Sequence, residues 1–198
     1  MYYTNLFISL LLITCLSACS GNTEQKNNNV NTSTQNKESL KVELALYKQA
    51  ILALNEKKLD QAEKLFTEMS ELQPDIAGPW ANLALISIKK DNPKQAQQYI
   101  DTALQKNPTM PQALNLAGDL ALKDNRIKDA KKYFEQAIAN KSDYALAHYN
   151  LALIFDIYYQ DIPQAITHYQ LYLQYTKQPD EATERWLKGL KSTVGNNS

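Results

Sequence analysis

The sequence predicts an all-α fold in which helix hairpins stack on one another. Three alanines, Ala62, Ala96 and Ala130, are separated by 34 residues each, and an aromatic or aliphatic residue follows each of them four positions later. Apolar residues make up 44% of the chain and only 5 of its 198 residues are glycine, which is typical of packed helices. Because a single hairpin cannot cover its own apolar face, this repeat predicts hairpins that bury their faces against their neighbours.

Residues 1–18 predict a signal peptide. The segment contains an apolar run of 13 residues, 6–18, which is shorter than the roughly 20 residues that a helix needs to span a bilayer. It leads into Leu16-Ser17-Ala18-Cys19, which resembles the lipobox of bacterial lipoproteins.

This resemblance implies that Cys19 becomes the first residue of the mature chain and carries acyl chains such as palmitate. Two or more acyl chains hold a protein stably on a membrane without spanning it. Ser20 follows the cysteine. In Gram-negative lipoproteins the lack of an aspartate at this position favours the outer membrane, with the chain facing the periplasm.

Residues 19–39 predict a lipidated cysteine and a disordered tether. Between Ser20 and Glu38 there are six asparagines and a single aliphatic residue, Val30. Such a segment cannot bury enough apolar surface to offset the entropy lost on ordering. As a flexible coil it would reach on the order of 25 Å, enough to lift a small domain clear of the lipid headgroups.

Residues 40–179 carry recurring landmarks that match the pattern W-x2-L-G-x2-Y…A-x3-F…P. Trp80, Leu83, Ala84, Ala96 and Pro108 fit this pattern in one copy. The chain therefore resembles the tetratricopeptide-repeat proteins, which implies a right-handed superhelical solenoid. The frame predicts four repeats, at about 43–76, 77–110, 111–144 and 145–179. We expect their helix pairs at roughly 40–72, 76–106, 110–139 and 143–176, with Asn92, Asn125 and Asp161 among the residues that start helices.

The fourth repeat contains one extra residue. Its small residues Ala152 and Ala165 are 13 positions apart, whereas Ala84 and Ala96 are 12 apart. Seven of the chain's twelve tyrosines also lie between residues 144 and 175, in or next to this repeat. Exposed tyrosines at the Tyr158-Tyr159 edge are a second candidate contact surface, with packing of a helix end on its own loop as the alternative.

Residues 180–194 predict a helix that caps the stack. Glutamates lie near its amino end, where acidic residues are favoured, and apolar residues recur every four positions. The expected apolar stripe is Ala182, Trp186, Leu190 and Val194. We expect Trp186 to be buried against the fourth hairpin, and anchoring of a partner is the alternative.

Catalysis is not indicated. The 21 basic and 21 acidic residues balance, so there is no net field to attract nucleic acid. The only histidines are His148 and His168, and Cys19 would be the only cysteine left after cleavage, which is too few ligands for a metal site. No phosphate loop, nucleophile elbow or H-E-x-x-H motif is present. We expect no enzymatic activity, cofactor, metal, nucleic acid or small-molecule substrate.

The repeat frame also predicts a partner-binding groove. In tetratricopeptide arrays, residues 2, 5, 9 and 12 of each first helix tend to line the concave face. Residues at these positions form the predicted groove: Tyr47, Ile51, Leu54, Leu85, Ile88, Asn115, Asp119, Leu122, Tyr149, Leu153 and Asp156. A mainly apolar groove with a polar patch in the third repeat suits an extended segment or amphipathic helix of a protein partner. The alternative is a narrow groove in which these side chains merely touch one another.

The lipobox, the tether and the stacked repeats together resemble the lipoproteins of type IV pilus biogenesis, which help secretin subunits reach or assemble in the outer membrane. This resemblance implies a non-catalytic, lipid-anchored scaffold that binds protein partners in the periplasm. An adaptor for peptidoglycan enzymes or for outer-membrane protein assembly is the alternative.

Overall fold

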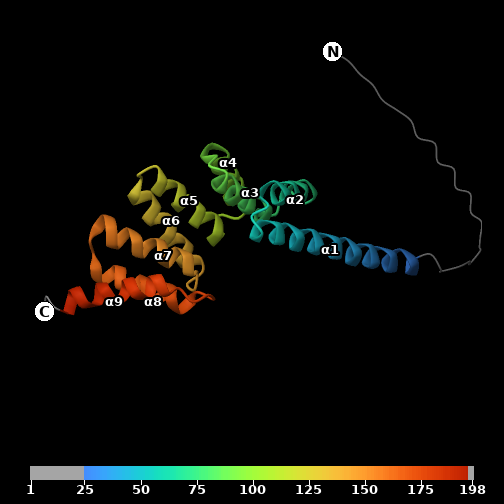
Figure 1. Ribbon diagram of the computed structural model, residues 1–198. Coiled ribbons are helices and arrows are strands. Elements are labelled where there is room, and N and C mark those ends of the chain that lie inside the picture. Colours follow the sequence, from blue (N-terminus) through green and yellow to red (C-terminus); the bar gives the residue numbers. More distant parts are fainter. Residues whose placement is uncertain (1–24, 196–198) are drawn as a thin grey trace, which may run out of the picture. The chain divides into compact units, whose positions relative to one another are not determined.

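The computed structural model describes residues 25–195, with side chains described for residues 40–194. This part of the chain is all-α and contains no strand, as the sequence predicts (Figure 1). No helix in the described part is long and apolar enough to cross a bilayer. The predicted signal peptide, residues 1–18, and the predicted lipidation site, Cys19, lie outside the described residues.

Apart from the start of α1, the helices follow the predicted pairs within a few residues. They are α1 (Gln25–Asn55), α2 (Leu59–Leu72), α3 (Ala77–Lys89), α4 (Pro93–Lys106), α5 (Pro111–Lys123), α6 (Ile127–Asn140), α7 (Ala145–Leu153), α8 (Ile162–Tyr175) and α9 (Glu181–Gly195), with a π-helix, η1 (Ile154–Tyr159), between α7 and α8.

The start of α1 corrects the tether prediction. The chain divides into two units after Lys41, a position within α1, which begins at Gln25. The helical region therefore begins well before Leu40, and residues 25–39 are helical where the sequence predicts disorder. Nucleation is the costly step of helix formation, and each further residue adds a hydrogen bond, so an existing helix can extend through a polar segment.

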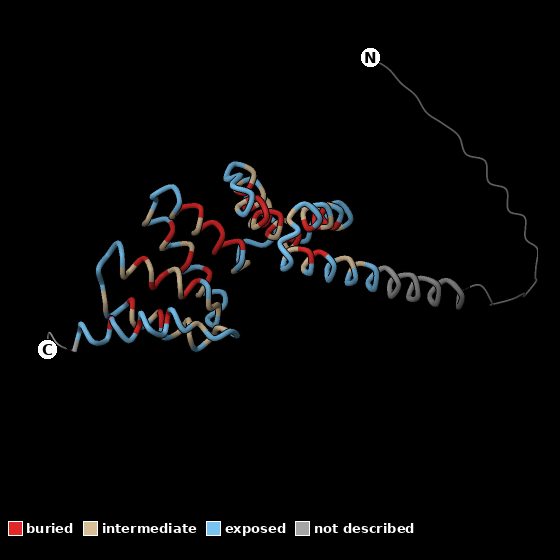
Figure 2. Tube along the Cα trace, viewed as in Figure 1, coloured by how far each residue is buried: buried red, intermediate tan, exposed pale blue. Residues whose placement is uncertain are grey.

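The unit of residues 42–198 is built from helix hairpins that pack in chain order. Helix α3 packs on α4, α5 on α6 and α7 on α8, and successive hairpins meet through α2 and α3, α4 and α5, and α6 and α7. Residues of α1 such as Ala50 and Ala53 share a buried cluster with Phe66 of α2. Helix α9 packs on α8. Figure 2 shows the buried residues as stripes along these helices, with exposed residues on their opposite sides.

Small residues lie where the helices meet most closely. The repeat-spaced alanines of the second helices are fully buried, as predicted: Ala62, Ala96, Ala130 and Ala165. On α5 the small residue is Gly118, and a Cβ atom placed there would lie only 2.7 Å from Cδ1 of Phe134 on α6. Phe134 is itself 0% exposed, so its ring has no room to move away.

The turn inside each hairpin contains one residue with a left-handed backbone. These residues are Lys57, Asp91, Asn125 and Gln160, with φ between 52° and 60°. Asn92 and Asp161 cap helices as predicted, since their side chains accept the N–H groups of residues three positions later. Asn125 does not start a helix, because it occupies the left-handed position, which asparagine tolerates better than most residues.

The extra residue of the fourth repeat is accommodated by η1. In the third hairpin the N–H of Arg126 donates to the carbonyl of Ala121 at 2.7 Å, five residues back. In the fourth, the N–H of Asp161 donates to the carbonyl of Phe155 at 2.9 Å, six residues back. A single inserted residue typically widens one helical turn into a π-helix, often near a functional site.

Substitution of Gly118 tests how tightly the hairpins are packed. Gly118→Ala should lower the free energy of unfolding by roughly 1–3 kcal/mol, because the added methyl group overpacks against Phe134. Gly189→Ala in α9 is the matched control, since nothing lies within 4 Å of its added Cβ, and it should stabilise by up to about 1 kcal/mol. Urea unfolding measures both. Equal stabilisation by the two substitutions would show that α5 and α6 are not in close contact.

Candidate functional site

The first helices of four consecutive hairpins line one cavity of ≈ 260 Å³, which we call the groove cavity. Its walls come from α1, α3, α5 and α7, with Met110 and Tyr144 contributed by the residues that precede α5 and α7. The lining residues are Tyr47, Gly78, Ala81, Asn82, Leu85, Met110, Gln112, Asn115, Leu116, Asp119, Tyr144 and Leu146. Helices that are far apart in the sequence thus share one concave surface.

The structure brings only some of the predicted groove residues into this cavity. Tyr47, Leu85, Asn115 and Asp119 line it. The predicted residues Ile51, Leu54, Ile88 and Leu122 instead pack against buried clusters of the hairpins. The physical reason is the small residues between the helices, which let neighbours approach and cover the later positions of each first helix.

Several lining residues were not predicted. Met110 and Tyr144 lie just before α5 and α7, outside the repeat positions 2, 5, 9 and 12 that define the predicted groove. Asn82 and Leu116 each follow one of these positions by one residue. A wider window around each groove position would have found the last two. Asn150, one position after Tyr149, was also missed, although it holds the polar part of the groove together.

A hydrogen-bond network joins α5 to α7 at the groove cavity. The side-chain amide of Asn150 donates to Oδ1 of Asp119 at 2.9 Å and to Oδ1 of Asn115 at 3.1 Å. The amide of Asn115 donates to the other oxygen of Asp119 at 3.2 Å. Each carboxylate oxygen of Asp119 therefore receives one amide hydrogen, which fixes the carboxylate plane at the cavity wall.

Burial dominates the electrostatics of this network. Desolvation raises the pKa of the Asp119 carboxyl to about 7, and the hydrogen bond from Asn150 offsets this only in part. The pKa of the nearby Tyr144 phenol rises to about 12, first through burial and then through the charge of Asp119. No lysine or arginine of the described residues forms an ion pair with Asp119.

Three predicted residues, Tyr149, Leu153 and Asp156, lie at a second hollow of ≈ 340 Å³ beside α9 rather than in the groove cavity. Asp156 belongs to η1, and its Oδ2 accepts hydrogen bonds from Trp186 Nε1 at 2.7 Å and from the Tyr169 hydroxyl at 3.2 Å. The π-helix thus carries a carboxylate that is hydrogen-bonded to both α8 and the capping helix.

The predicted burial of Trp186 is wrong. Its side chain is 56% exposed, and the buried residues of α9 are Thr183, Leu187 and Leu190. Successive helical residues are about 100° apart, and Thr183 and Leu187 are buried in place of Ala182 and Trp186, while Leu190 is buried as predicted. The alternative role, an exposed tryptophan available to a partner, is compatible with this geometry.

The two histidines form a structural pair. His148 Nε2 lies 3.0 Å from the carbonyl of Ser142, which can only accept, so in a neutral His148 ring Nδ1 accepts from His168 Nδ1 at 3.0 Å. Burial, and next the neighbouring His148, lower the pKa of His168 to about 4. Both ring nitrogens of His148 are used within the fold. Among the described residues no cluster of histidine, cysteine or carboxylate side chains could hold a metal ion.

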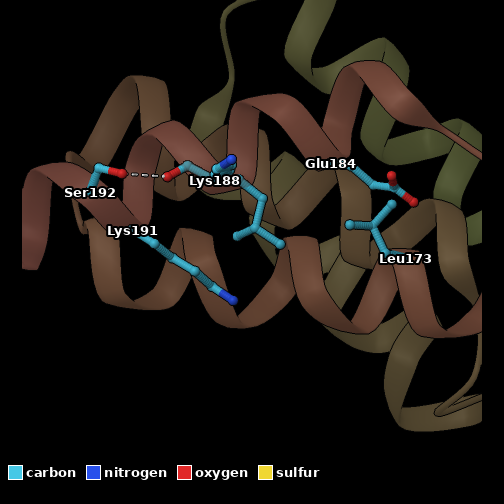
Figure 3. A pocket seen from close by; sticks show the side chains of 6 residues that line it. Leu173, Glu184, Lys188, Lys191 and Ser192 are labelled. Atoms are coloured by element: carbon cyan, nitrogen blue, oxygen red, sulfur yellow. Dashed lines mark hydrogen bonds between the residues drawn. The ribbon is translucent and has the colours of Figure 1, made fainter.

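Another hollow, of ≈ 460 Å³, lies between α8 and α9 (Figure 3). Its labelled side chains include Glu184 and Lys191, which lie apart, and the Ser192 hydroxyl donates to the Lys188 carbonyl of its own helix at 3.0 Å. These groups do not converge on a common point. The groove cavity is therefore the better candidate site.

Family models of the tetratricopeptide repeat match residues 53–120 and 115–182. The chain belongs to the tetratricopeptide-repeat family. No curated protein matches its sequence.

Solved structures of other tetratricopeptide-repeat proteins share this fold. PilF of Pseudomonas aeruginosa has a TM-score of 0.67 at 18% identity, covering 79% of this chain and 70% of its own. A thermophilic TPR protein of Thermus thermophilus has a TM-score of 0.63 at 18% identity, with 78% and 84% covered. An O-GlcNAc transferase of Thermobaculum terrenum has a TM-score of 0.59 at 16% identity, with 67% and 26% covered. The last similarity shows that such folds also occur within enzymes.

The raised pKa of Asp119 predicts how its removal changes stability with pH. The folded protein holds this proton up to about pH 7, whereas the unfolded chain loses it near pH 3.8. The carboxyl therefore destabilises the fold increasingly as the pH rises from 3.8 to 7, and the penalty stays constant above pH 7. Asp119→Asn should therefore raise the free energy of unfolding at pH 8.5 by roughly 1–3 kcal/mol and change it little below pH 4.

Urea titrations at the two pH values measure this difference. Asp101→Asn is the matched control, because Asp101 is exposed on α4 and its removal should have little effect at either pH. A wild type more stable than Asp119→Asn at pH 8.5 would mean that the carboxylate is not desolvated.

Proposed function

We propose that this chain is a non-catalytic scaffold that binds a segment of a protein partner in the groove cavity. Repeats of this family form interaction scaffolds. The observation that carries the proposal is the single cavity lined by four first helices, with exposed apolar side chains at its edges, Tyr47 at 40% and Leu146 at 54%. An exposed apolar surface of this kind suits a partner segment.

The scaffold is held at the outer membrane, facing the periplasm, by acyl chains on Cys19. The support for this anchoring is the lipobox-like Leu16-Ser17-Ala18-Cys19 at the end of an apolar segment, with Ser20 after it. Repeats that start from a lipid anchor would meet envelope proteins at the membrane surface.

Assembly of an envelope machine such as a pilus or secretin is the pathway we favour. Its support is the fold shared with PilF over 79% of this chain, together with the lipobox and the stacked repeats. The alternative is an adaptor for peptidoglycan enzymes or for outer-membrane protein assembly, which would use the same groove. The identity of the bound partner distinguishes this alternative from the pilus or secretin pathway.

Site-specific photocrosslinking tests the groove. Benzoylphenylalanine in place of Leu146 should capture one envelope protein in living cells, because the side chain lines the groove cavity while remaining half exposed. The same replacement at Leu72, which is 60% exposed on α2 and outside the cavity, is the control. Mass spectrometry identifies the crosslinked protein. Equal capture of that protein at both positions would place the binding surface outside the groove.

Lipidation is tested on the membrane-extracted protein. Its mass should match a chain that begins at Cys19 and carries acyl groups, since the lipobox-like pattern ends there. Cys19→Ala should abolish the acyl mass and leave the chain unprocessed or unanchored. A soluble wild-type chain that begins at another residue would contradict the anchor.

A further inference from the structure

The groove cavity contains one charged side chain in a neutral lining. Of the described residues that form its wall, only Asp119 carries a formal charge. The remainder are apolar, amide or phenolic side chains and a glycine. The charge lies between apolar surfaces, with Ala81 and Leu85 of α3 on one side and Leu146 of α7 on the other.

The Asp119 carboxylate differs from the exposed carboxylates that pair with lysines of the next hairpin. Asp75 pairs with Lys106 at 2.8 Å, and Asp91 pairs with Lys123, so each of these two exposed carboxylates has a cationic partner. Asp119 receives only the amides of Asn115 and Asn150 from the described residues. A carboxylate has about four acceptor sites, so the network leaves about half of this capacity open.

We propose that the groove cavity binds an apolar protein segment that carries a single lysine or arginine, whose cationic group pairs with Asp119. This inference rests on the proposed function and names the chemistry of its partner.

The physical basis is the cost of covering a charge. A neutral segment laid over the cavity would remove the remaining water from the carboxylate without replacing its hydrogen bonds, which is unfavourable. An acidic segment would add repulsion at the same point. A basic side chain supplies the missing donors and opposite charge, while its apolar neighbours cover Leu85 and Leu146. Asp119 thus selects against the wrong partners as well as for the right one.

A peptide selection tests this chemistry on the full mature chain. A phage library of random twelve-residue peptides is selected against the wild-type protein, and the enriched peptides should contain one lysine or arginine flanked by apolar residues. An enriched peptide and its version with glutamine at the basic position are then titrated into wild type, Asp119→Asn and the control Asp101→Asn by fluorescence anisotropy.

Asp119→Asn should weaken the basic peptide at least about tenfold and should not weaken the glutamine version, because it removes the cost of covering the charge, while Asp101→Asn changes neither. Loss of folding does not explain such a result, because the protein without this carboxylate is expected to be at least as stable at pH 8.5. Melting curves of all three proteins verify this point.

A second pair of variants separates this inference from the proposed function. Leu146→Gln removes an apolar contact of the cavity without changing charge, and Leu72→Gln is its control outside the cavity. The inference would be overturned, with groove binding left intact, if the selected peptides bind Leu146→Gln more weakly than wild type but contain no basic residue and bind Asp119→Asn as tightly as wild type. Peptides insensitive to Leu146→Gln, or a selection that enriches none, would overturn both.

Discussion

The close approach of helices at small residues is the constraint on which the rest of this structure depends. Ala96 and Ala130 are fully buried, and at Gly118 even a methyl group would overlap the ring of Phe134. Because the helices approach this closely, side chains late in each first helix, such as Ile88 and Leu122, are drawn into the interfaces between helices. What remains open on the concave side is therefore a short cavity rather than a groove along every first helix.

Much of the fold could be predicted because a 34-residue period constrains the backbone directly. Repeat-spaced alanines indicate where helices meet, and helix boundaries after the start of α1 follow within a few residues. The register of α9 was harder to predict, since Trp186 and Leu187 both belong to plausible apolar stripes and only packing on α8 decides between them. Asn150 was missed for a related reason, because its contact with Asp119 spans 31 residues and depends on how two hairpins are rotated against each other.

The inserted residue of the fourth repeat shows how a local change in the backbone redirects chemistry. Asp156 lies in the π-helix that accommodates this residue, and its carboxylate accepts hydrogen bonds from Trp186 of α9 and Tyr169 of α8. The hydrogen bond from Trp186 Nε1 to Asp156 holds the exposed indole in one orientation at the end of the repeats. Two aspartates from equivalent faces of neighbouring repeats thus serve different purposes, one joining the capping helix and one lining the groove cavity.

The charge of Asp119 is hard to explain by folding alone. An asparagine would have nearly the same shape and could still hydrogen-bond with Asn115 and Asn150, and it would avoid the desolvation that raises the pKa of the carboxyl to about 7. A stabilising role in the free protein would favour the neutral side chain, as buried charges without a cation oppose folding. The feature that distinguishes aspartate from asparagine here is its negative charge, and no cation among the described residues uses it. A basic group on a bound partner is the simplest use for that charge.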